Sequence, residues 1–218
     1  MNESRTRRAV AEVSRLLHER GWVANHDGNV SARVGPDRIV CTPTAISKRL
    51  IVEDLLIVVD AEGRLVAGRG RPFSEIGLHL AVYRARRDVG AVVHAHPPHA
   101  TALGCAGRGI DAMPIAEAVV SLGERIPLVE YATPGPDAVK AVEPFLALHD
   151  ALLLASHGTI AYGADPEVAL LRTELVEHLS RILLCAAPLG GACALPPESV
   201  ATLLQARAKA GIGPPGRR

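Results

Sequence analysis

Three histidines are the residues of this sequence whose types and spacing most suggest chemistry. His94 and His96 stand two positions apart at the end of a predicted buried strand, and such side chains point to the same side of an extended chain. His157 follows another predicted buried strand and precedes Gly158, which we expect to permit a sharp backbone turn. Three imidazoles could hold one divalent metal ion and leave a coordination position open to a substrate.

The alternative is that each histidine is an ordinary core or surface residue. A His-x-His pair is a weak signal by itself, and spacing alone does not show that the two strand ends meet. Five other histidines are interpreted as structural or exposed, namely His18, His79, His99, His149 and His178.

Glu75 is the carboxylate that could work beside such a metal. It follows Ser74, which we expect to cap a helix, so Glu75 could also be a simple first-turn residue favoured by the helix dipole. In a partly dry pocket a carboxylate could move a proton at a carbon next to a polarised carbonyl. Residues 27–31 and 42–45 are turn-like and rich in N–H and hydroxyl donors, so they could surround an oxyanion or be ordinary turns.

The elements that must position these residues alternate along the chain, which favours helices packed on a sheet. We predict helices at 4–20 behind a possible Ser4 cap, from 74 onward, near 99–105, at 136–148, from 166 to before Pro188, and at 196–210. We predict strands at 38–41, 55–59, 64–67, 90–94, 128–130, 151–155 and 159–162. The chain reads as one domain over 1–210 followed by a flexible tail at 211–218.

Composition limits the classes of function. The chain has 218 residues, 48% hydrophobic side chains and a formal net charge of +1, which suits a single core and predicts no nucleic-acid partner. No apolar run approaches the roughly 20 residues needed to cross a bilayer, so we expect a cytoplasmic protein that does not bind membranes. The four cysteines are predicted to be reduced, buried thiols; they are Cys41, Cys105, Cys185 and Cys193.

Five motifs, taken in order, resemble those of the class II aldolase and adducin family, especially its L-fuculose-1-phosphate aldolase branch. They are Gly28-Asn29-Val30-Ser31, Thr42-Pro43-Thr44, Ser74-Glu75, Ala91-Val92-Val93-His94-Ala95-His96 and Ser156-His157-Gly158. The match covers nearly the whole chain, and five ordered motifs are more specific than any one of them.

The resemblance implies a single three-layer α/β/α domain with a central, mainly antiparallel sheet, and a homotetramer with active sites at subunit interfaces. It implies Zn²⁺, or another divalent metal such as Mn²⁺ or Co²⁺, on His94, His96 and His157, with Glu75 as the catalytic acid and base. The substrate-phosphate pocket that it implies consists of Gly28, Asn29, Thr44, Ala45 and Ser74.

The implied reaction is the metal-dependent cleavage of a ketose 1-phosphate, such as L-fuculose 1-phosphate or a 5-deoxypentulose 1-phosphate. The products would be dihydroxyacetone phosphate and a small aldehyde, formed through a metal-stabilised enediolate. The enzyme would therefore be an aldehyde-lyase of carbohydrate metabolism whose partner is a small sugar phosphate.

The phosphate loops depart from the family pattern. His26, Asp27 and Phe73 stand where small or hydroxylated side chains are usual, and Ala45 replaces a usual glycine. An ionised Asp27 about 4 Å from a phosphate would repel it by roughly 1 to 4 kcal/mol. The substrate could carry another anion, or a protonated His26 could compensate.

The proton donors also depart from the pattern, because no tyrosine lies near Ile115 or in the C-terminal tail. Glu117 lies about where the methylthioribulose-1-phosphate dehydratases of the family place a catalytic glutamate, although it could be an exposed helix-start residue. The same metal site could thus serve a dehydratase or a ribulose-5-phosphate 4-epimerase. A purely structural adducin-like head is disfavoured because the three histidines and Glu75 are all present.

Overall fold

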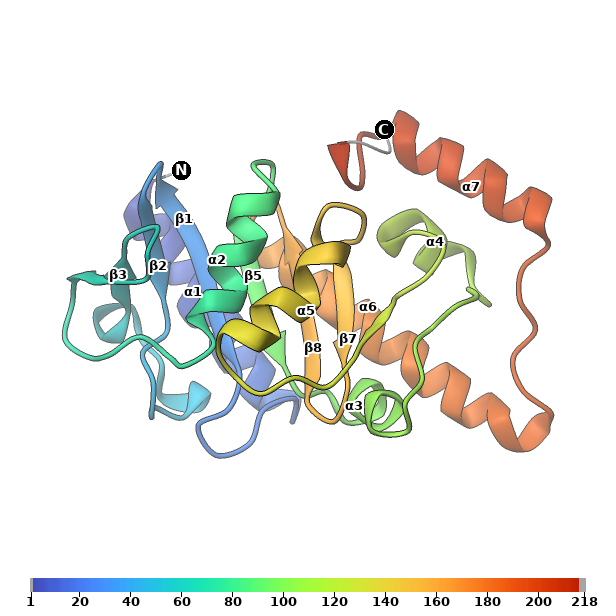
Figure 1. Cartoon of the computed structure of the whole chain (residues 1–218), viewed down its shortest axis with the longest axis horizontal. Coiled ribbons are helices and arrows are strands. Elements are labelled where there is room, and N and C mark those ends of the chain that lie inside the picture. Colours follow the sequence, from blue (N-terminus) through green and yellow to red (C-terminus); the bar gives the residue numbers. More distant parts are fainter. Residues whose placement is uncertain (1, 216–218) are drawn as a thin grey trace.

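The computed structural model describes residues 2–215 and is built around one eight-stranded sheet (Figure 1). The strands are β1 (Asn29–Gly35), β2 (Arg38–Cys41), β3 (Ile57–Val59), β4 (Leu65–Ala67), β5 (Ala91–Ala95), β6 (Leu128–Val129), β7 (Ala151–Leu154) and β8 (Gly158–Gly163). Their order in the sheet is β4-β3-β2-β1-β5-β8-β7-β6. β6 and β7 pair in parallel and the other neighbours pair antiparallel. The predicted, mainly antiparallel sheet is confirmed.

Helices cover both faces of this sheet, which confirms the three-layer α/β/α fold. The helices are α1 (Glu3–Glu19), α2 (Ile76–Ala85), α3 (Pro98–Cys105), α4 (Ala116–Leu122), α5 (Pro136–Leu146), α6 (Pro166–Ala186) and α7 (Pro197–Lys209). Short 3-10 turns are η1 (Lys48–Leu50), η2 (Glu53–Leu55) and η3 (Ala187–Leu189). One core cluster joins α2 and α5 to one face of the sheet, and a second joins α1 and α6 to the other. A third cluster gathers α3, α4 and α6, with α7 against it.

The central strand β5 is apolar on both faces because it is covered by helices on both sides. Val92 belongs to the cluster of α2 and α5, whereas Ala91 and Val93 belong to the cluster of α1 and α6. All five of its residues are buried, including His94. A histidine at this depth must have its polar atoms satisfied by specific partners.

The strand β1 was not predicted, because its first residues resemble a turn. Val30 and Ala32 face the α1 side, but Ser31 between them contacts α2, where its hydroxyl lies 2.7 Å from His79 Nδ1 and 2.8 Å from the Tyr83 hydroxyl. This polar pairing inside the core replaces the apolar residue that would have marked a buried strand. Helix α4 was not among the predicted helices, although Glu117 in its first turn was interpreted as a possible helix-start residue.

Two predicted helix caps are wrong by one or two positions. Helix α1 is capped by Asn2, whose side chain accepts from Ser4 N, so Ser4 is not the cap. The N-cap of α2 is Glu75 and not Ser74, and its side chain makes no capping hydrogen bond because it is turned towards the histidines described below.

The described part of the C-terminal segment folds back on α7. Ile212 N donates to the Arg207 carbonyl oxygen, and Gly213 and Pro214 are buried. The remainder of the predicted tail, residues 216–218, lies outside the described residues.

Two expectations from composition concern the burial of the cysteines and the absence of a helix that could cross a membrane. All four cysteines are free, but only Cys41 is buried, so the prediction that all are buried is wrong; Cys105, Cys185 and Cys193 lie at helix ends or in a loop. Within residues 2–215 no helix has the length and apolarity required to cross a bilayer.

Candidate metal centre

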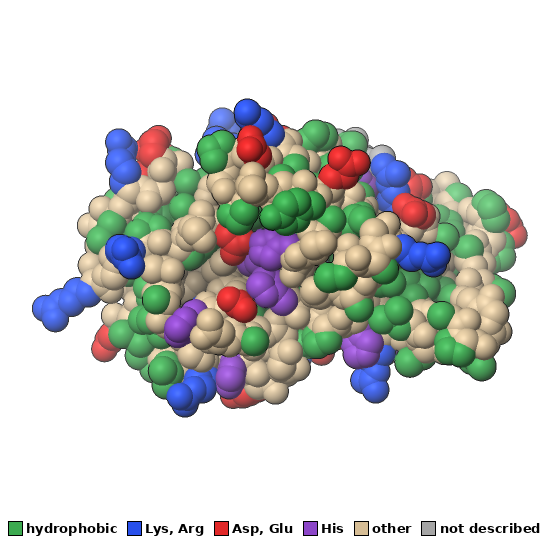
Figure 2. Space-filling view, turned by 60° about the horizontal axis from the view of Figure 1, so that its bottom comes forward, with side chains coloured by type: hydrophobic (Ala, Val, Ile, Leu, Met, Phe, Trp, Pro, Cys, Tyr) green, Lys and Arg blue, Asp and Glu red, His purple; other side chains and the backbone are tan. Residues whose placement is uncertain are grey.

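The structure brings the three predicted metal ligands together. His94 lies on β5, His96 follows the end of that strand, and His157 lies in the turn between β7 and β8. Their candidate ligand atoms all lie within 4.8 Å of one another. Figure 2 shows histidine side chains gathered in a hollow of the surface beside acidic ones.

The pairing of β5 with β8 orients the first histidine. His94 Nδ1 lies 2.8 Å from the carbonyl oxygen of Thr159, which can only accept, so Nδ1 carries the proton and Nε2 keeps its lone pair. Nε2 then faces His96 Nε2 at 3.1 Å. Metal-binding histidines are commonly held by such a carbonyl bond from the second ring nitrogen. The contribution of Thr159 was not predicted, because a backbone acceptor leaves no mark in the sequence.

Burial favours the neutral form of two of these rings, those of His94 and His96. Burial lowers the pKa of His96 to about 3, and the neighbouring His94 and His157 add to the effect. Burial likewise lowers the pKa of His94. Neutral imidazole is the form that binds a metal ion, so the converging ring nitrogens of His94, His96 and His157 fit a divalent cation.

Glu75 joins the histidines at the start of α2. Its Oε1 lies 3.0 Å from His157 Nε2, and its Oε2 lies 3.3 Å from His94 Nε2. Burial opposes ionisation of this carboxyl, but the hydrogen bonds from His157 and from the Asn29 amide favour the ionised form and lower its pKa. The group is therefore an ionised carboxylate facing the space between two candidate ligands.

Asn29, which is predicted to lie in the phosphate pocket, also supports Glu75. Asn29 Nδ2 donates to Glu75 Oε2 over 2.9 Å, and Asn29 stands opposite His94 in the pairing of β1 with β5. Its Oδ1 is buried and has no hydrogen-bond partner among the described residues. That oxygen is a candidate contact for a substrate hydroxyl.

The turn that carries His157 depends on two residues. Gly158 was expected to make the sharp turn, but it is Ser156 that takes a left-handed φ of 53°. Gly158 is required for another reason, because an added Cβ would lie 2.5 Å from the Ala95 carbonyl oxygen and 2.5 Å from His96 Cδ2. It lets β5 and β8 approach closely beside the metal ligands.

Two further loop positions have left-handed backbones. Gly28 has a φ of 71°, and a Cβ there would lie 2.3 Å from Val23 Cγ1, so glycine is required. Ala45 has a φ of 59°, which explains in physical terms why a glycine is usual at this position.

Lys48 connects the two loops and was not predicted. Its Nζ donates to the carbonyl oxygens of His26 and Ile46, each over 2.9 Å, although the residue is only 2% exposed. Burial lowers its pKa to about 8, and attraction to Asp27 opposes that change. A lysine on a short 3-10 turn ordinarily lies in solvent, so no local pattern marks its burial.

The other predicted site residues are less closely joined to the histidines. Thr44 N donates to the Arg71 carbonyl oxygen, and Ser74 is exposed at the rim of a pocket of about 240 Å³ that also contains Glu75 and His157. Glu117 is exposed in the first turn of α4, and no described contact joins it to the histidines. A phosphate-binding function of the loops and a catalytic function of Glu117 stay predictions.

A family profile described as "Class II Aldolase and Adducin N-terminal domain" matches residues 8–184 of this chain. The chain belongs to the class II aldolase and adducin family. The predicted family is thereby confirmed, and the histidines and Glu75 all lie within the matched residues.

Relatives in the class II aldolase family carry several names. An L-fuculose phosphate aldolase of Methanococcus maripaludis is 30% identical over 172 residues, which cover 78% of this chain and 92% of the relative. A methylthioribulose-1-phosphate dehydratase of Methylococcus capsulatus is 33% identical over 190 residues, covering 81% and 92%. A 3-oxo-tetronate 4-phosphate decarboxylase of Haemophilus influenzae is 29% identical over 188 residues, covering 84% and 88%.

The fold of the class II aldolases is shared over nearly the full chain. A solved structure of an L-fuculose 1-phosphate aldolase superposes with a TM-score of 0.87 at 27% identity, covering 96% of this chain and 97% of that one. These relatives are enzymes of more than one reaction type, so the family alone does not choose the substrate.

Proposed function

We propose that this chain is a metal-dependent aldolase that cleaves a ketose 1-phosphate, such as L-fuculose 1-phosphate or a 5-deoxypentulose 1-phosphate. The products would be dihydroxyacetone phosphate and a small aldehyde. The observation that carries the proposal is the ionised Glu75 carboxylate, 3.0 Å from His157 Nε2 and 3.3 Å from His94 Nε2, beside three converging imidazoles. The names of the relatives support the class of substrate.

His94, His96 and His157 would hold the metal ion, with Zn²⁺, Mn²⁺ and Co²⁺ all compatible with three imidazoles. When bound, such an ion supplies a Lewis acid that stabilises the negative charge developing on substrate oxygens as the carbon–carbon bond breaks. Thr159 keeps His94 in the tautomer that this binding requires.

Glu75 would handle the proton at carbon. Because it is ionised, Glu75 can accept a proton from a substrate carbon in the condensation direction. In the cleavage direction it can take the proton of the hydroxyl whose carbon becomes the aldehyde and deliver it to the carbon released from the broken bond. Asn29 holds one carboxylate oxygen, and the other lies 3.0 Å from His157 Nε2, at the edge of the candidate metal position. A carboxylate that is 15% exposed is also shielded from most competing water.

The pocket beside Glu75 and His157 suits an aldehyde with a short apolar end. Its volume is about 240 Å³, and its other lining residues are mainly apolar; they are Ser74, Gly77, Leu78, Ala132, Pro134, Gly135, Pro136, Ala138 and Val139. Apart from Glu75 and His157 it contains no charged or imidazole side chain among the described residues, so a methyl-bearing aldehyde such as lactaldehyde fits better than a charged one.

The proposed phosphate pocket remains that of Gly28, Asn29, Thr44, Ala45 and Ser74. The Lys48 ammonium lies beneath the two loops and attracts Asp27, so it offers a second way, besides a protonated His26, to offset repulsion between Asp27 and a phosphate. The proposal further includes a homotetramer, which follows from the family resemblance, and the cytoplasmic location that was expected from the pattern of apolar residues in the sequence.

The decisive experiment incubates the metal-loaded protein with a panel of ketose 1-phosphates and measures release of dihydroxyacetone phosphate. His157→Ala should lose bound metal and activity, and Glu75→Gln should keep metal but lose most turnover. Exposed residues of the same type, His178→Ala and Glu167→Gln, are the matched controls.

Products other than dihydroxyacetone phosphate and an aldehyde would contradict the proposed aldolase reaction. A dehydrated diketone without an aldehyde would indicate a dehydratase, for which Glu117→Gln would then be the informative variant. Carbon dioxide release from a 3-oxo-tetronate 4-phosphate would indicate a decarboxylase, and interconversion of pentulose phosphates an epimerase. A protein that binds no metal and converts no substrate would contradict all of these and favour the structural alternative.

A further inference from the structure

A second pocket lies at the other end of β8 from the histidines. It has a volume of about 370 Å³ and is enclosed by the end of β8, helix α6, the end of α4 and the C-terminal turn. The residues that line it are Asp88, Ser121, Gly163, Ala164, Val168, Leu171, Arg172, Leu175, Gly211, Ile212 and Gly213. None of them lines the pockets beside His157, and residues 158–162 of β8 lie between His157 and Gly163.

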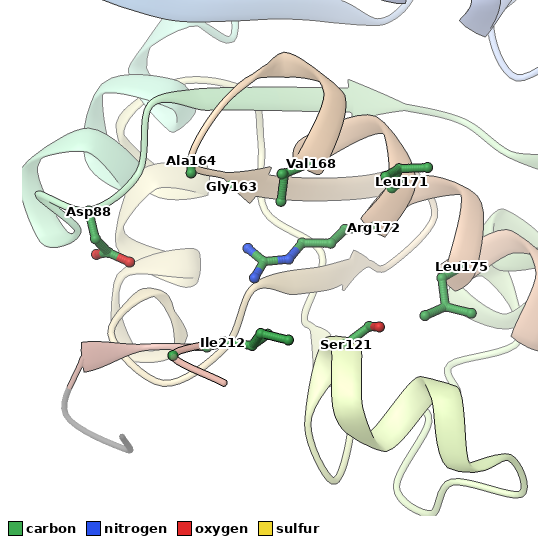
Figure 3. Close-up of a pocket in the computed structure, with 11 residues that line it drawn as sticks. Asp88, Ser121, Gly163, Ala164, Val168, Leu171, Arg172, Leu175 and Ile212 are labelled. Atoms are coloured by element: carbon green, nitrogen blue, oxygen red, sulfur yellow. The ribbon is translucent and has the colours of Figure 1, made fainter. Parts of the chain in front are cut away.

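The wall of this pocket is mainly aliphatic, with one cation across its middle. Figure 3 shows the Arg172 side chain reaching from α6 into the pocket, with Val168, Leu175 and Ile212 around it and Asp88 on the opposite side. Leu171 on the same helix is 51% exposed, so apolar surface there remains open to a ligand. The Ser121 hydroxyl on α4 is the further polar side chain of this wall.

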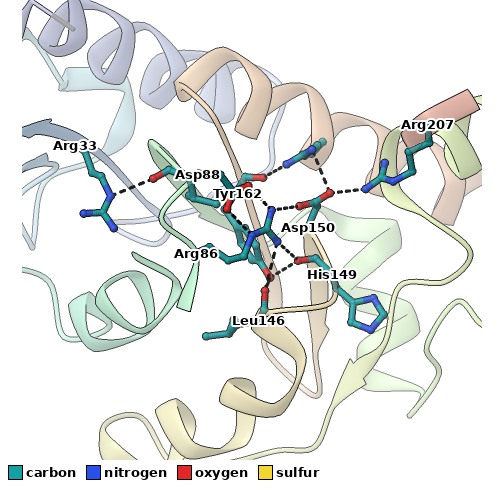
Figure 4. Close-up of polar contacts among 10 residues, drawn as sticks. Arg33, Arg86, Asp88, Leu146, His149, Asp150, Tyr162 and Arg207 are labelled. Atoms are coloured by element: carbon teal, nitrogen blue, oxygen red, sulfur yellow. Dashed lines mark hydrogen bonds and ion pairs between the residues drawn. The ribbon is translucent and has the colours of Figure 1, made fainter. Parts of the chain in front are cut away.

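The cation belongs to a buried network that has more positive than negative groups. Asp150 is fully buried and pairs with three guanidiniums, namely Arg86 at 2.9 Å, Arg172 at 3.2 Å and Arg207 at 2.5 Å (Figure 4). Asp88 is held by Arg86 through two bonds of 2.8 Å. Among the described residues of this network, three cations therefore face two carboxylates.

Arg172 is the member of the network that reaches the pocket. Its Nη1 donates to the Tyr162 carbonyl oxygen and its Nη2 pairs with Asp150. Since a guanidinium has five N–H donors, these two bonds leave donors for a ligand. Burial lowers the pKa of Arg172; attraction to Asp150 opposes this, and repulsion from Arg207 and Arg86 adds to it. An added anion would relieve that repulsion.

We propose that this pocket binds a small aliphatic carboxylate, with its carboxylate on Arg172 and its short apolar chain against Val168, Leu171, Leu175 and Ile212. The charge favours a monoanion, because the part of the network within residues 2–215 has one surplus positive charge and two carboxylates that would repel a dianion. The volume is at the small end of ligand sites, which limits the chain to a few carbons. Recognition would combine a charge-assisted hydrogen bond with burial of the chain.

The test is titration calorimetry of the full-length, metal-loaded protein with hexanoate, hexanol and hexylamine as probes. Hexanoate should bind saturably, and hexanol and hexylamine at least tenfold more weakly. Arg172→Met should weaken hexanoate binding at least tenfold, whereas Arg181→Met, an exposed charge loss on the same helix, should not. Equal binding of hexanol and hexanoate, or hexanoate binding that survives Arg172→Met, would overturn the proposal.

Two further variants distinguish this pocket from binding elsewhere on the protein. Ser121→Trp fills the pocket without removing any ion pair, so it should abolish hexanoate binding even if Arg172→Met fails to fold. Hexanoate could also bind a metal ion, and His157→Ala should therefore leave its affinity unchanged. Retained binding in Ser121→Trp, or loss in His157→Ala alone, would contradict the proposed site.

Discussion

Gly158 sits where β8 begins, with His96 on one side and the backbone of Ala95 on the other. We predict that Gly158→Ala lowers the free energy of unfolding by about 1 to 3 kcal/mol, because the added Cβ overpacks a buried contact. It should also reduce bound metal, since the nearest atom that can move is His96 Cδ2. Chemical unfolding and metal analysis measure the two effects.

Gly35→Ala is the matched control for that change. Its added Cβ would meet no atom closer than 3.6 Å, so we expect a change within about 0.5 kcal/mol and full metal content. Normal metal content in Gly158→Ala would contradict this prediction, because it would show that His96 can move away from the added Cβ and still bind the metal ion.

Lys48 gives stability a defined pH dependence. Its pKa falls from 10.5 to about 8 on folding, so between these values the unfolded chain binds more protons than the folded protein. Stability contributed by Lys48 therefore rises with pH above about 8, by at most about 1.4 kcal/mol per pH unit. Urea unfolding from pH 7 to 10 measures the free energy of unfolding of the wild type and of Lys48→Met. Above pH 8 the value for the wild type should rise relative to that for Lys48→Met, and below pH 8 the difference between the two should be constant.

Site residues that act through their side chains could be predicted from the sequence, whereas those that act through the backbone or through three-dimensional packing could not. The sequence motifs identified His94, His96, His157 and Glu75, and the structure brings these four together. Thr159 could not be found, because it acts through its carbonyl oxygen. Lys48 was missed because its burial depends on two loops that meet only in three dimensions.

Helix α3 begins directly after the candidate metal ligands His94 and His96 and has no capping side chain of its own. Glu177 of α6 supplies the cap instead, since its carboxylate accepts from His99 N at 3.2 Å and from Ala100 N at 2.9 Å. We predict that Glu177→Ala lowers the free energy of unfolding by about 1 to 2 kcal/mol, as measured by urea unfolding. Glu174→Ala removes only a surface ion pair with Arg20 and should cost less than about 1 kcal/mol.

Elements with regular apolar periodicity were predicted well, and elements built on polar contacts were not. Helix α6 and strand β7 follow predicted positions closely, because the buried residues of α6 recur at helical spacing and β7 is a short, continuous apolar run. Strand β1 was missed because Asn29 and Ser31 face partners on other elements, which a local pattern cannot show. The cap of α2 was misplaced because Glu75 contacts the histidines and not its own helix.

Asp150 joins distant parts of the molecule, because its three arginines come from the end of α2, from α6 and from α7. Removing its charge leaves those guanidiniums buried without their shared partner. We predict that Asp150→Asn lowers the free energy of unfolding by about 3 to 5 kcal/mol, measured by denaturant unfolding. Asp60→Asn, which breaks an exposed pair with Arg64, should change it by less than about 1 kcal/mol. If the two substitutions lowered the free energy of unfolding equally, the Asp150 network would have to be exposed to water, which would contradict its burial in the structure.

The whole fold was predictable through family resemblance and not through local patterns. The motifs indicated a three-layer domain, and the sheet and its two helical layers confirm it. The Asp150 network was invisible beforehand, since two of its partners lie 64 and 57 positions away in sequence. Such contacts follow from the packing of α2, α6 and α7 and carry no local signature.

The pairing of β5 with β8 also bears on the order of events during folding. His94 and Thr159 are 65 positions apart, so the three imidazoles meet only after a long loop has closed, and such non-local pairings form slowly. If the loop closes after the rate-limiting step of folding, the three histidines cannot bind a metal ion until the folding transition state has been passed. We therefore expect zinc to leave the refolding rate nearly unchanged and to slow unfolding, so that the ion would make the native state long-lived without making it quicker to form.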